Sequence, residues 1–190
     1  MLETINYKNF SINIEYDQDP LSPIEDYDCG LSIMACAHRS YNLGNSDISN
    51  ICREKNSWEE VSDAIIKQEK AICLIPLYLY DHSGLSISTA PFSCRWDSGQ
   101  IGFVYTTKER LSTLGFDYKR ISSKRLSCIR QALIKEVAVY DDYLTGNAYS
   151  YRVIDKAGSE IDSCYNYLGD WQTSGLLDDA KASIDHYLTT

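Results

Sequence analysis

The chain lacks any apolar run long enough to cross a membrane. A membrane helix needs roughly 18 apolar residues in succession, and the longest run here, AICLIPLYLY at 71–80, is about half that length. The first ten residues, MLETINYKNF, have neither the basic nor the apolar segment of a secretory signal. We therefore expect a cytoplasmic protein (in the cytoplasm of the host cell if a phage encodes it) that has no membrane partner.

Paired cysteines and glycine-rich phosphate loops are also missing. None of the cysteines is spaced as CxxC, which disfavours a disulfide framework and a structural zinc site. There is no GxGxxG and no P-loop, so we expect neither nucleotide hydrolysis by a standard fold nor a cofactor. We expect most of the seven cysteines to be buried reduced thiols. They are Cys29, Cys36, Cys52, Cys73, Cys94, Cys128 and Cys164.

Acidic residues are in excess, and they are unevenly placed. The net charge is −9, but residues 108–135 hold eight Lys/Arg against two Asp/Glu, while 136–190 hold three against ten. An acidic exterior disfavours non-specific binding to nucleic acid and suits a basic protein partner. The basic helix within 119–135 has no interleaved aromatic residues, so direct nucleic-acid binding is not expected.

Apolar periodicity predicts the fold class. Ser57 followed by Glu60 forms a capping box for a helix over 58–69, and Pro76 predicts an edge position or a bulge in the strand 72–80. The order of elements favours an α+β fold, a mostly antiparallel sheet with two to three helices packed on one face as a single layer pair. The length fits one domain over 1–190. Strands are predicted at 10–17, 31–38, 72–80, 84–89 and 101–107, helices at 58–69, 122–144 and 176–188, and a hairpin at 148–170.

The segment 77–105, LYLYDHSGLSISTAPFSCRWDSGQIGFVY, carries most of the candidate functional residues. Arg95 and Trp96 are of the types that dominate interface hot spots. The alternative is an internally bonded turn in which Asp97 accepts from the backbone of 98–100. The acids at the end of the helix 122–144 oppose the helix dipole, which indicates either outside partners or solvated surface charge. The candidate binding residues are Asp81, His82, Arg95, Trp96, Asp97, Gln100, Tyr140, Asp141 and Asp142.

Two kinds of chemistry remain open in the same segment. Cys94 could act as a nucleophile if His82 or Arg95 stabilised its thiolate, with Asp97 or Asp81 orienting the imidazole. No known catalytic-cysteine signature matches FSCRWDSG, however. Two metal sites are weaker alternatives, and the prediction is that no metal is bound. Their ligands would be Cys36, His38, His82 and Cys94 for zinc, or Asp17 and Asp19 with Asp81 or Asp97 for Mg²⁺ or Ca²⁺.

Several long stretches resemble a family of small proteins encoded by bacterial phages and plasmids. The most specific is PLYLYDHSGLSISTAPFSCRWDSGQIGFVYTTKE at 76–109. The others are IEYDQDPLSP at 14–23, GLSIMACAHRSYNLGN at 30–45, EVAVYDDYLTGNAYSYRV at 136–153 and DSCYNYLGD at 162–170. The resemblance covers most of the chain and carries over no catalytic residues. It implies an accessory protein of mobile elements, a class that often counters host defence.

These observations favour a binding protein over an enzyme. The leading hypothesis is a phage-type protein that binds and inhibits a host defence protein or protein–nucleic-acid complex, of anti-CRISPR or antirestriction type. Its acidic surface would mimic or compete with nucleic acid. The alternatives are a Cys/His-dependent hydrolase that acts on a nucleotide or peptide, and a binder that sequesters a small signalling nucleotide.

Overall fold

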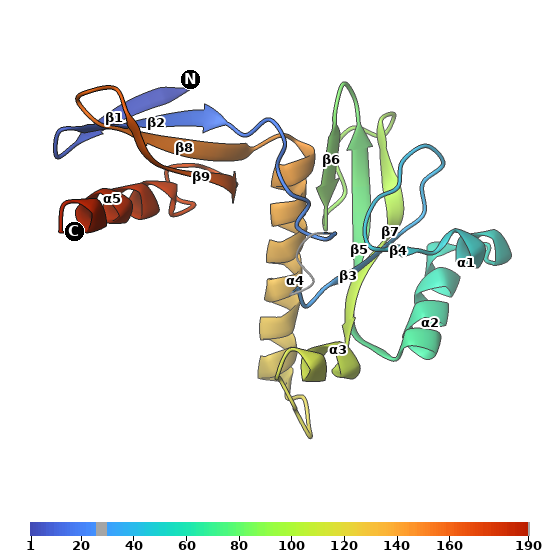
Figure 1. The fold of residues 1–190 in the computed structure, drawn as a ribbon. Coiled ribbons are helices and arrows are strands. Elements are labelled where there is room, and N and C mark those ends of the chain that lie inside the picture. Colours follow the sequence, from blue (N-terminus) through green and yellow to red (C-terminus); the bar gives the residue numbers. More distant parts are fainter. Residues whose placement is uncertain (26–29, 190) are drawn as a thin grey trace. The chain divides into compact units, whose positions relative to one another are not determined.

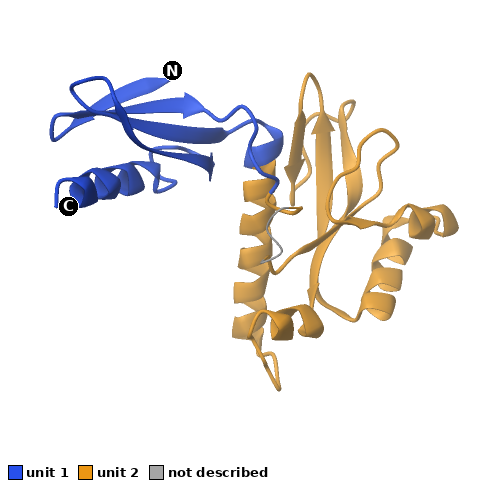
Figure 2. Ribbon diagram, viewed as in Figure 1, with its two compact units in different colours: residues 1–22, 142–190 blue, residues 23–141 orange. Residues whose placement is uncertain are grey.

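The chain forms two compact units in this computed structural model, which describes residues 1–25 and 30–189. Unit 1 comprises Met1–Ser22 and Asp142–Thr190, and unit 2 comprises Pro23–Asp141 (Figure 2). Unit 2 is therefore inserted between the two segments of unit 1. The single domain over 1–190 stays a prediction, and each unit is described by itself.

Unit 1 is an antiparallel sheet with one helix packed against it. Along β2, alternate residues Phe10, Ile12 and Ile14 are buried, and they form one core with Leu176 and Ile184 of α5. This is the face that alternation and helical spacing would bring together. The strand order is β1-β2-β8-β9. The elements are β1 (Glu3–Tyr7), β2 (Phe10–Tyr16), β8 (Ala148–Ile154), β9 (Glu160–Leu168) and α5 (Leu176–Tyr187).

Unit 2 is a five-stranded sheet with the order β4-β3-β7-β5-β6. Its strand pairs are antiparallel except β3 with β4. The strands are β3 (Ile33–Cys36), β4 (Ser46–Asp47), β5 (Ala71–Asp81), β6 (Leu85–Ser88) and β7 (Ser98–Thr107). The helices are α1 (Ser49–Glu54), α2 (Trp58–Glu69), α3 (Lys108–Thr113) and α4 (Ser123–Leu144), whose last three residues belong to unit 1.

Helices cover both faces of this five-stranded sheet (Figure 1). On one face, Val61 and Ile65 of α2 pack with Phe103 of β7. On the other, α4 lies along the sheet, and its Asp141 carboxylate accepts hydrogen bonds from Ser86 Oγ and Ile87 N of β6, at 2.8 and 2.7 Å. The sheet thus has two buried faces, which fits the nearly continuous apolar character of β5 and β7.

The α+β prediction is confirmed. A single layer pair was expected, whereas the structure has two sheets, one of which is covered by helices on both faces. Helix α2 begins after Ser57, whose Oγ accepts from Glu60 N as in a capping box. Pro76 lies where β5 pairs with β7 alone, since β6 reaches only from Tyr78 to Asp81. The sequence patterns missed β1, β4, α1 and α3, which are short or largely exposed.

The described cysteines are free thiols. Cys36 and Cys73 are buried, and burial raises the pKa of Cys36 to about 12. The expectation that most cysteines are buried is wrong for the described residues, because Cys52, Cys94 and Cys164 are only partly buried and Cys128 is exposed on α4. Cys29 lies outside the described residues. In the part of the chain that the structure describes, no helix is both long and apolar enough to cross a membrane.

Candidate functional site

The candidate site in unit 2 is built by the connection that joins β6 to β7. These two strands lie on opposite sides of β5, so residues 89–97 must cross one face of β5. Phe92 marks the crossing point, because its ring lies 5.6 Å from that of Tyr80. The connection then joins β7 at Ser98, which pairs with Tyr80. The sheet order therefore places the SCRWDSG turn beside the end of β5.

Asp97 is the centre of the hydrogen bonds that hold this turn. Its carbonyl oxygen accepts from Asp81 N at 2.8 Å, which extends the β5–β7 ladder by one bond. Its Oδ2 lies 3.5 Å from Cys94 Sγ and 3.4 Å from His82 Nδ1. Ser98 Oγ donates to the Cys94 carbonyl. The turn is thus internally bonded, through these groups and not through the Asx-turn considered from the sequence.

Trp96 projects from this bonded turn with 95% of its surface exposed. Arg95 beside it is also exposed. Leaving a whole indole ring in water forgoes about 1.5–3 kcal/mol that burial of a large apolar side chain supplies. The residues before and after Trp96, Arg95 and Asp97, are polar, and the hydrogen bonds of Asp97 and Ser98 fix the turn. The sequence therefore places Trp96 outside the core.

A groove of about 360 Å³ lies at the foot of the Trp96 turn. Tyr41 reaches its edge and donates to Asp81 Oδ1 at 3.3 Å, and the negative charge of Asp81 raises the pKa of Tyr41. The His38 ring stacks on Tyr41 at 4.9 Å. The groove therefore offers acceptors, a stacked ring pair and the indole. Its lining residues are His38, Leu79, Asp81, Trp96, Asp97, Ser98, Gly99, Gln100 and Ile101.

A second hollow, of about 310 Å³, shares His38 with the first. The loop 38–43 lines it together with Cys36, Asp47 and Ser49. Side-chain and backbone hydrogen bonds from Ser49 lower the pKa of Asp47, which keeps that carboxylate charged. The two hollows together give a mostly polar surface around His38.

The structure brings most of the predicted binding residues together. Asp81, Trp96, Asp97 and Gln100 line one groove, and His82 contacts Asp97. Sequence reasoning missed Tyr41 as part of this surface and considered His38 only as a metal ligand. Both occur in the AHRSYNLGN stretch, where a histidine and a tyrosine three residues apart were the available signal.

Three of the predicted binding residues lie elsewhere. Tyr140 is 3% exposed, and its hydroxyl accepts from Gly44 N at 3.3 Å, which places it in the core of unit 2. Asp141 anchors β6 to α4. Asp142 belongs to unit 1, where its Oδ1 accepts from Asn147 Nδ2 at 3.3 Å. The acids at the end of α4 therefore have internal partners, which the helix-dipole argument did not anticipate.

The catalytic candidates are close together but in an unfavourable order. A nucleophilic cysteine needs a base or a cation beside its sulfur. Here the Asp97 carboxylate lies next to both Cys94 and His82. In a catalytic triad the imidazole lies between the nucleophile and the carboxylate, whereas here the carboxylate lies between the thiol and the imidazole.

The metal hypotheses gain no support from the geometry. Within residues 1–25 and 30–189, no three His, Cys, Asp or Glu side chains are placed to hold a metal ion. Asp17 and Asp19 belong to unit 1, and the Asp17 carboxylate accepts from Asn166 N at 2.9 Å and Asp19 N at 3.2 Å. Cys36, His38 and Asp47 line the second hollow, but they are not placed to hold a metal ion together.

Comparisons of the chain with known protein families, curated proteins and solved structures find no match. The site must therefore be interpreted from its own geometry and chemistry.

Proposed function

We propose that this chain is a mobile-element accessory protein that binds and inhibits a host nucleic-acid-handling defence system, of anti-CRISPR or antirestriction type. The single observation that carries the binding role is the exposure of Trp96 on an ordered turn. The resemblance to phage- and plasmid-encoded proteins supports the choice of partner class.

The Trp96 turn has the properties of an interface anchor. Hot spots are enriched in tryptophan and arginine, and they cost at least about 2 kcal/mol of binding free energy when truncated. Trp96 and Arg95 are adjacent and exposed, and the bonds to Asp97 order the turn before binding. An ordered turn loses less conformational entropy on association than a mobile loop does. Asp81 and Gln100 supply polar groups around the anchor.

The charge of unit 1 supports competition with nucleic acid. Unit 1 carries four Lys/Arg and twelve Asp/Glu, a net charge of −8, whereas unit 2 carries fourteen and fifteen, a net charge of −1. Almost all of the excess acid therefore lies in the smaller unit. A basic nucleic-acid groove attracts such a surface by charge complementarity, which raises the association rate at low salt.

We expect the Trp96→Ala variant to lose inhibition of the defence system. Plasmid transformation is measured in bacterial strains that each carry one active system, a restriction enzyme or a CRISPR nuclease, with the protein expressed beforehand. Wild type should raise transformation in at least one strain. With the purified complex of that system, Trp96→Ala should bind about 30-fold more weakly or worse, because a hot-spot residue supplies about 2 kcal/mol or more.

Ile66→Ala is the matched control. Ile66 is an exposed apolar residue on α2, 46% exposed, and its removal should leave inhibition unchanged. The proposal is wrong if wild type protects plasmids in none of the strains. It is also wrong if a folded Trp96→Ala protein inhibits as well as wild type does.

A Cys94-dependent hydrolase is the second candidate, because Cys94, Asp97 and His82 do meet. The rate of labelling by iodoacetamide at neutral pH, followed cysteine by cysteine by mass spectrometry, separates the two functions. For a binding protein we expect Cys94 to label more slowly than the exposed Cys128, since its S–H faces a carboxylate. Labelling of Cys94 about tenfold faster than Cys128 would favour the enzyme, because nucleophilic cysteines are activated as thiolates.

A further inference from the structure

A second exposed aromatic feature lies in unit 2, between α3 and α4. Phe116 and Tyr118 stack with their ring centroids 6.2 Å apart and their planes at 26°. The guanidinium carbon of Arg125 lies over the Tyr118 ring, 4.5 Å from its centroid. Phe116 is 46% exposed, so one end of this stack of three planar groups is open to solvent.

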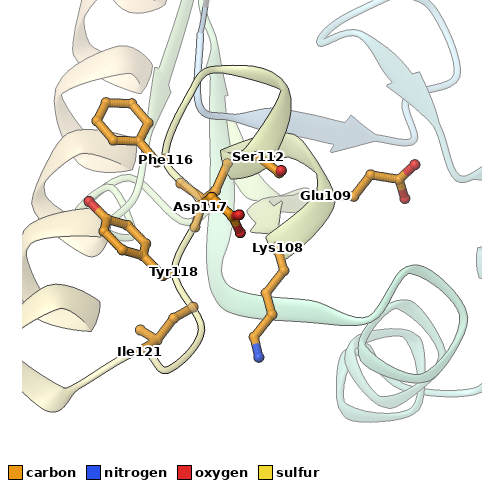
Figure 3. Close-up of a pocket in the computed structure, with 8 residues that line it drawn as sticks. Lys108, Glu109, Ser112, Phe116, Asp117, Tyr118 and Ile121 are labelled. Carbon is orange, nitrogen blue, oxygen red and sulfur yellow. The ribbon is translucent and has the colours of Figure 1, made fainter.

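The two rings line a pocket of about 290 Å³ (Figure 3). Its other lining residues are Lys108, Glu109, Leu111, Ser112, Asp117 and Ile121. In this close-up the Phe116 and Tyr118 rings point to the same side, and the side chain of the intervening Asp117 points away from them. Asp117 still lines the same pocket, so its carboxylate lies near the two rings although it points to another side.

Four cations lie next to this stack. Lys119 and Arg120 directly follow Tyr118, and Lys124 and Arg125 occupy the first turn of α4. Arg125 ties the two groups together, because its Nη1 donates to the Arg120 carbonyl at 3.2 Å. Lys119, Arg120, Lys124 and Arg125 are exposed, and no ion pair to an acid is recorded for them among the residues that the structure describes.

Cations at the first turn of a helix are unfavourable for the helix itself. The amino end of a helix carries partial positive charge, so Lys124 and Arg125 add like charge to that end of α4. An anion bound there would relieve this repulsion and would meet the helix dipole favourably. The placement is therefore better suited to a protein that binds an anion than to a free one.

We propose that Phe116, Tyr118, Lys119, Arg120, Lys124 and Arg125, the basic–aromatic surface, bind a single-stranded nucleic acid. Phosphates would lie on the four cations and a base would stack on the open face of Phe116, the combination that single-strand binding proteins use without sequence preference. A duplex hides its base faces, and a carboxylate of an acidic protein offers no extended planar ring to stack on Phe116. The observations therefore favour a single strand over both.

This inference goes beyond the proposed function and replaces the sequence-based expectation that direct nucleic-acid binding is absent. That expectation considered residues 119–135 and found no aromatic residue among the cations. Phe116 and Tyr118 lie just before that segment, in GFDYKR at 115–120, and the fold stacks one of them under Arg125. The inference needs no host protein, so it can fail while the proposed function stands.

The test measures binding of a fluorescein-labelled mixed-sequence 20-nucleotide DNA single strand by fluorescence anisotropy at 50 mM salt. Phe116→Ala should weaken binding about 5- to 150-fold, the range reported by alanine substitution for one stacked base. Phe116→Leu keeps an apolar side chain and removes only the π-face, so it should weaken binding as well. Tyr165→Ala removes an aromatic residue of unit 1 that is 59% exposed, and it should bind like wild type.

The salt dependence tests the cations separately. Four phosphate contacts give a slope of log K against log salt of about −2.8 on a single strand, and removing two should change it to about −1.4. The double variant Arg120→Ala/Lys124→Ala removes two of the four phosphate contacts and should show the smaller slope. The double variant Arg53→Ala/Lys67→Ala removes the same charge from exposed positions on α1 and α2 and should keep the wild-type slope.

Three results would overturn the inference. The first is wild-type affinity in Phe116→Leu, which would exclude base stacking. The second is an unchanged salt slope in Arg120→Ala/Lys124→Ala. The third is displacement of the DNA strand by poly-glutamate at an equal concentration of charges, which would indicate a surface for acidic proteins.

Discussion

Replacing Gly102 with alanine is expected to unfold unit 2. Gly102 lies in β7 between β3 and β5, and a Cβ at this position would stand 1.9 Å from the Ala35 carbonyl oxygen and 2.9 Å from its carbon. These neighbours are backbone atoms of a paired strand, so no side-chain rotation can relieve the clash. Strand β3 would have to separate from β7, and we expect a loss of about 3 kcal/mol or more, at the upper end of overpacking costs.

Gly99→Ala is the control in the same strand. A Cβ at Gly99 meets no atom within 4 Å, and its backbone is not in the left-handed region. Alanine there should leave stability unchanged or raise it slightly, since glycine loses more backbone entropy on folding. Urea unfolding followed by circular dichroism compares the two variants. Equal midpoints for Gly102→Ala and Gly99→Ala would show that the β3–β7 pairing is not as described.

Replacing Leu176 with alanine is expected to destabilise unit 1 by about 2–5 kcal/mol, the usual cost of emptying a fully buried leucine site. Leu176 opens α5 with 0% of its surface exposed, in one core cluster with Ile12 and Ile14 of β2. Unit 1 is the smaller unit, and small units have little stability to spare. The loss should therefore approach the whole stability of unit 1.

Leu188→Ala tests whether burial is the cause. Leu188 follows the same helix, is 54% exposed, and should change stability by less than about 0.5 kcal/mol. Hydrogen exchange by mass spectrometry reports which amides lose protection. We expect faster exchange in β2 and β8 for Leu176→Ala alone. Equal exchange in the two variants would contradict the packing of α5 on the sheet.

Local patterns predicted the long elements well because those elements depend on residues near in sequence. The α2 helix begins after Ser57 as the capping box indicates, and the buried residues of α4, Ile129, Leu133, Val137 and Tyr140, follow the apolar stripe. The division into two sheets was not predictable in this way. It depends on the pairing of β2 with β8, whose residues are more than 130 positions apart.

The site was predicted in composition but not in geometry. A polar segment between two strands pointed to the Trp96 turn, whereas the meeting of Asp97 with His82 depends on the crossing over β5. Tyr140 carried two conflicting signals, an acidic neighbourhood and a place on the apolar stripe, and the stripe prevailed because burial of a ring is worth more than surface charge. The groove around His38 and Tyr41 has no sequence signature of its own.

The insertion of unit 2 into unit 1 has a consequence for synthesis on the ribosome. Strand β2 leaves the ribosome early, but its partner β8 follows only after all of unit 2, since Ile12 pairs with Val153. At about 5–20 residues per second, β2 waits roughly 7–30 s for that partner. During this time Ile12 and Ile14 have no native core to enter, while unit 2 has its complete sequence available first. Nascent chains should therefore complete unit 2 before unit 1, which needs segments from both sides of it.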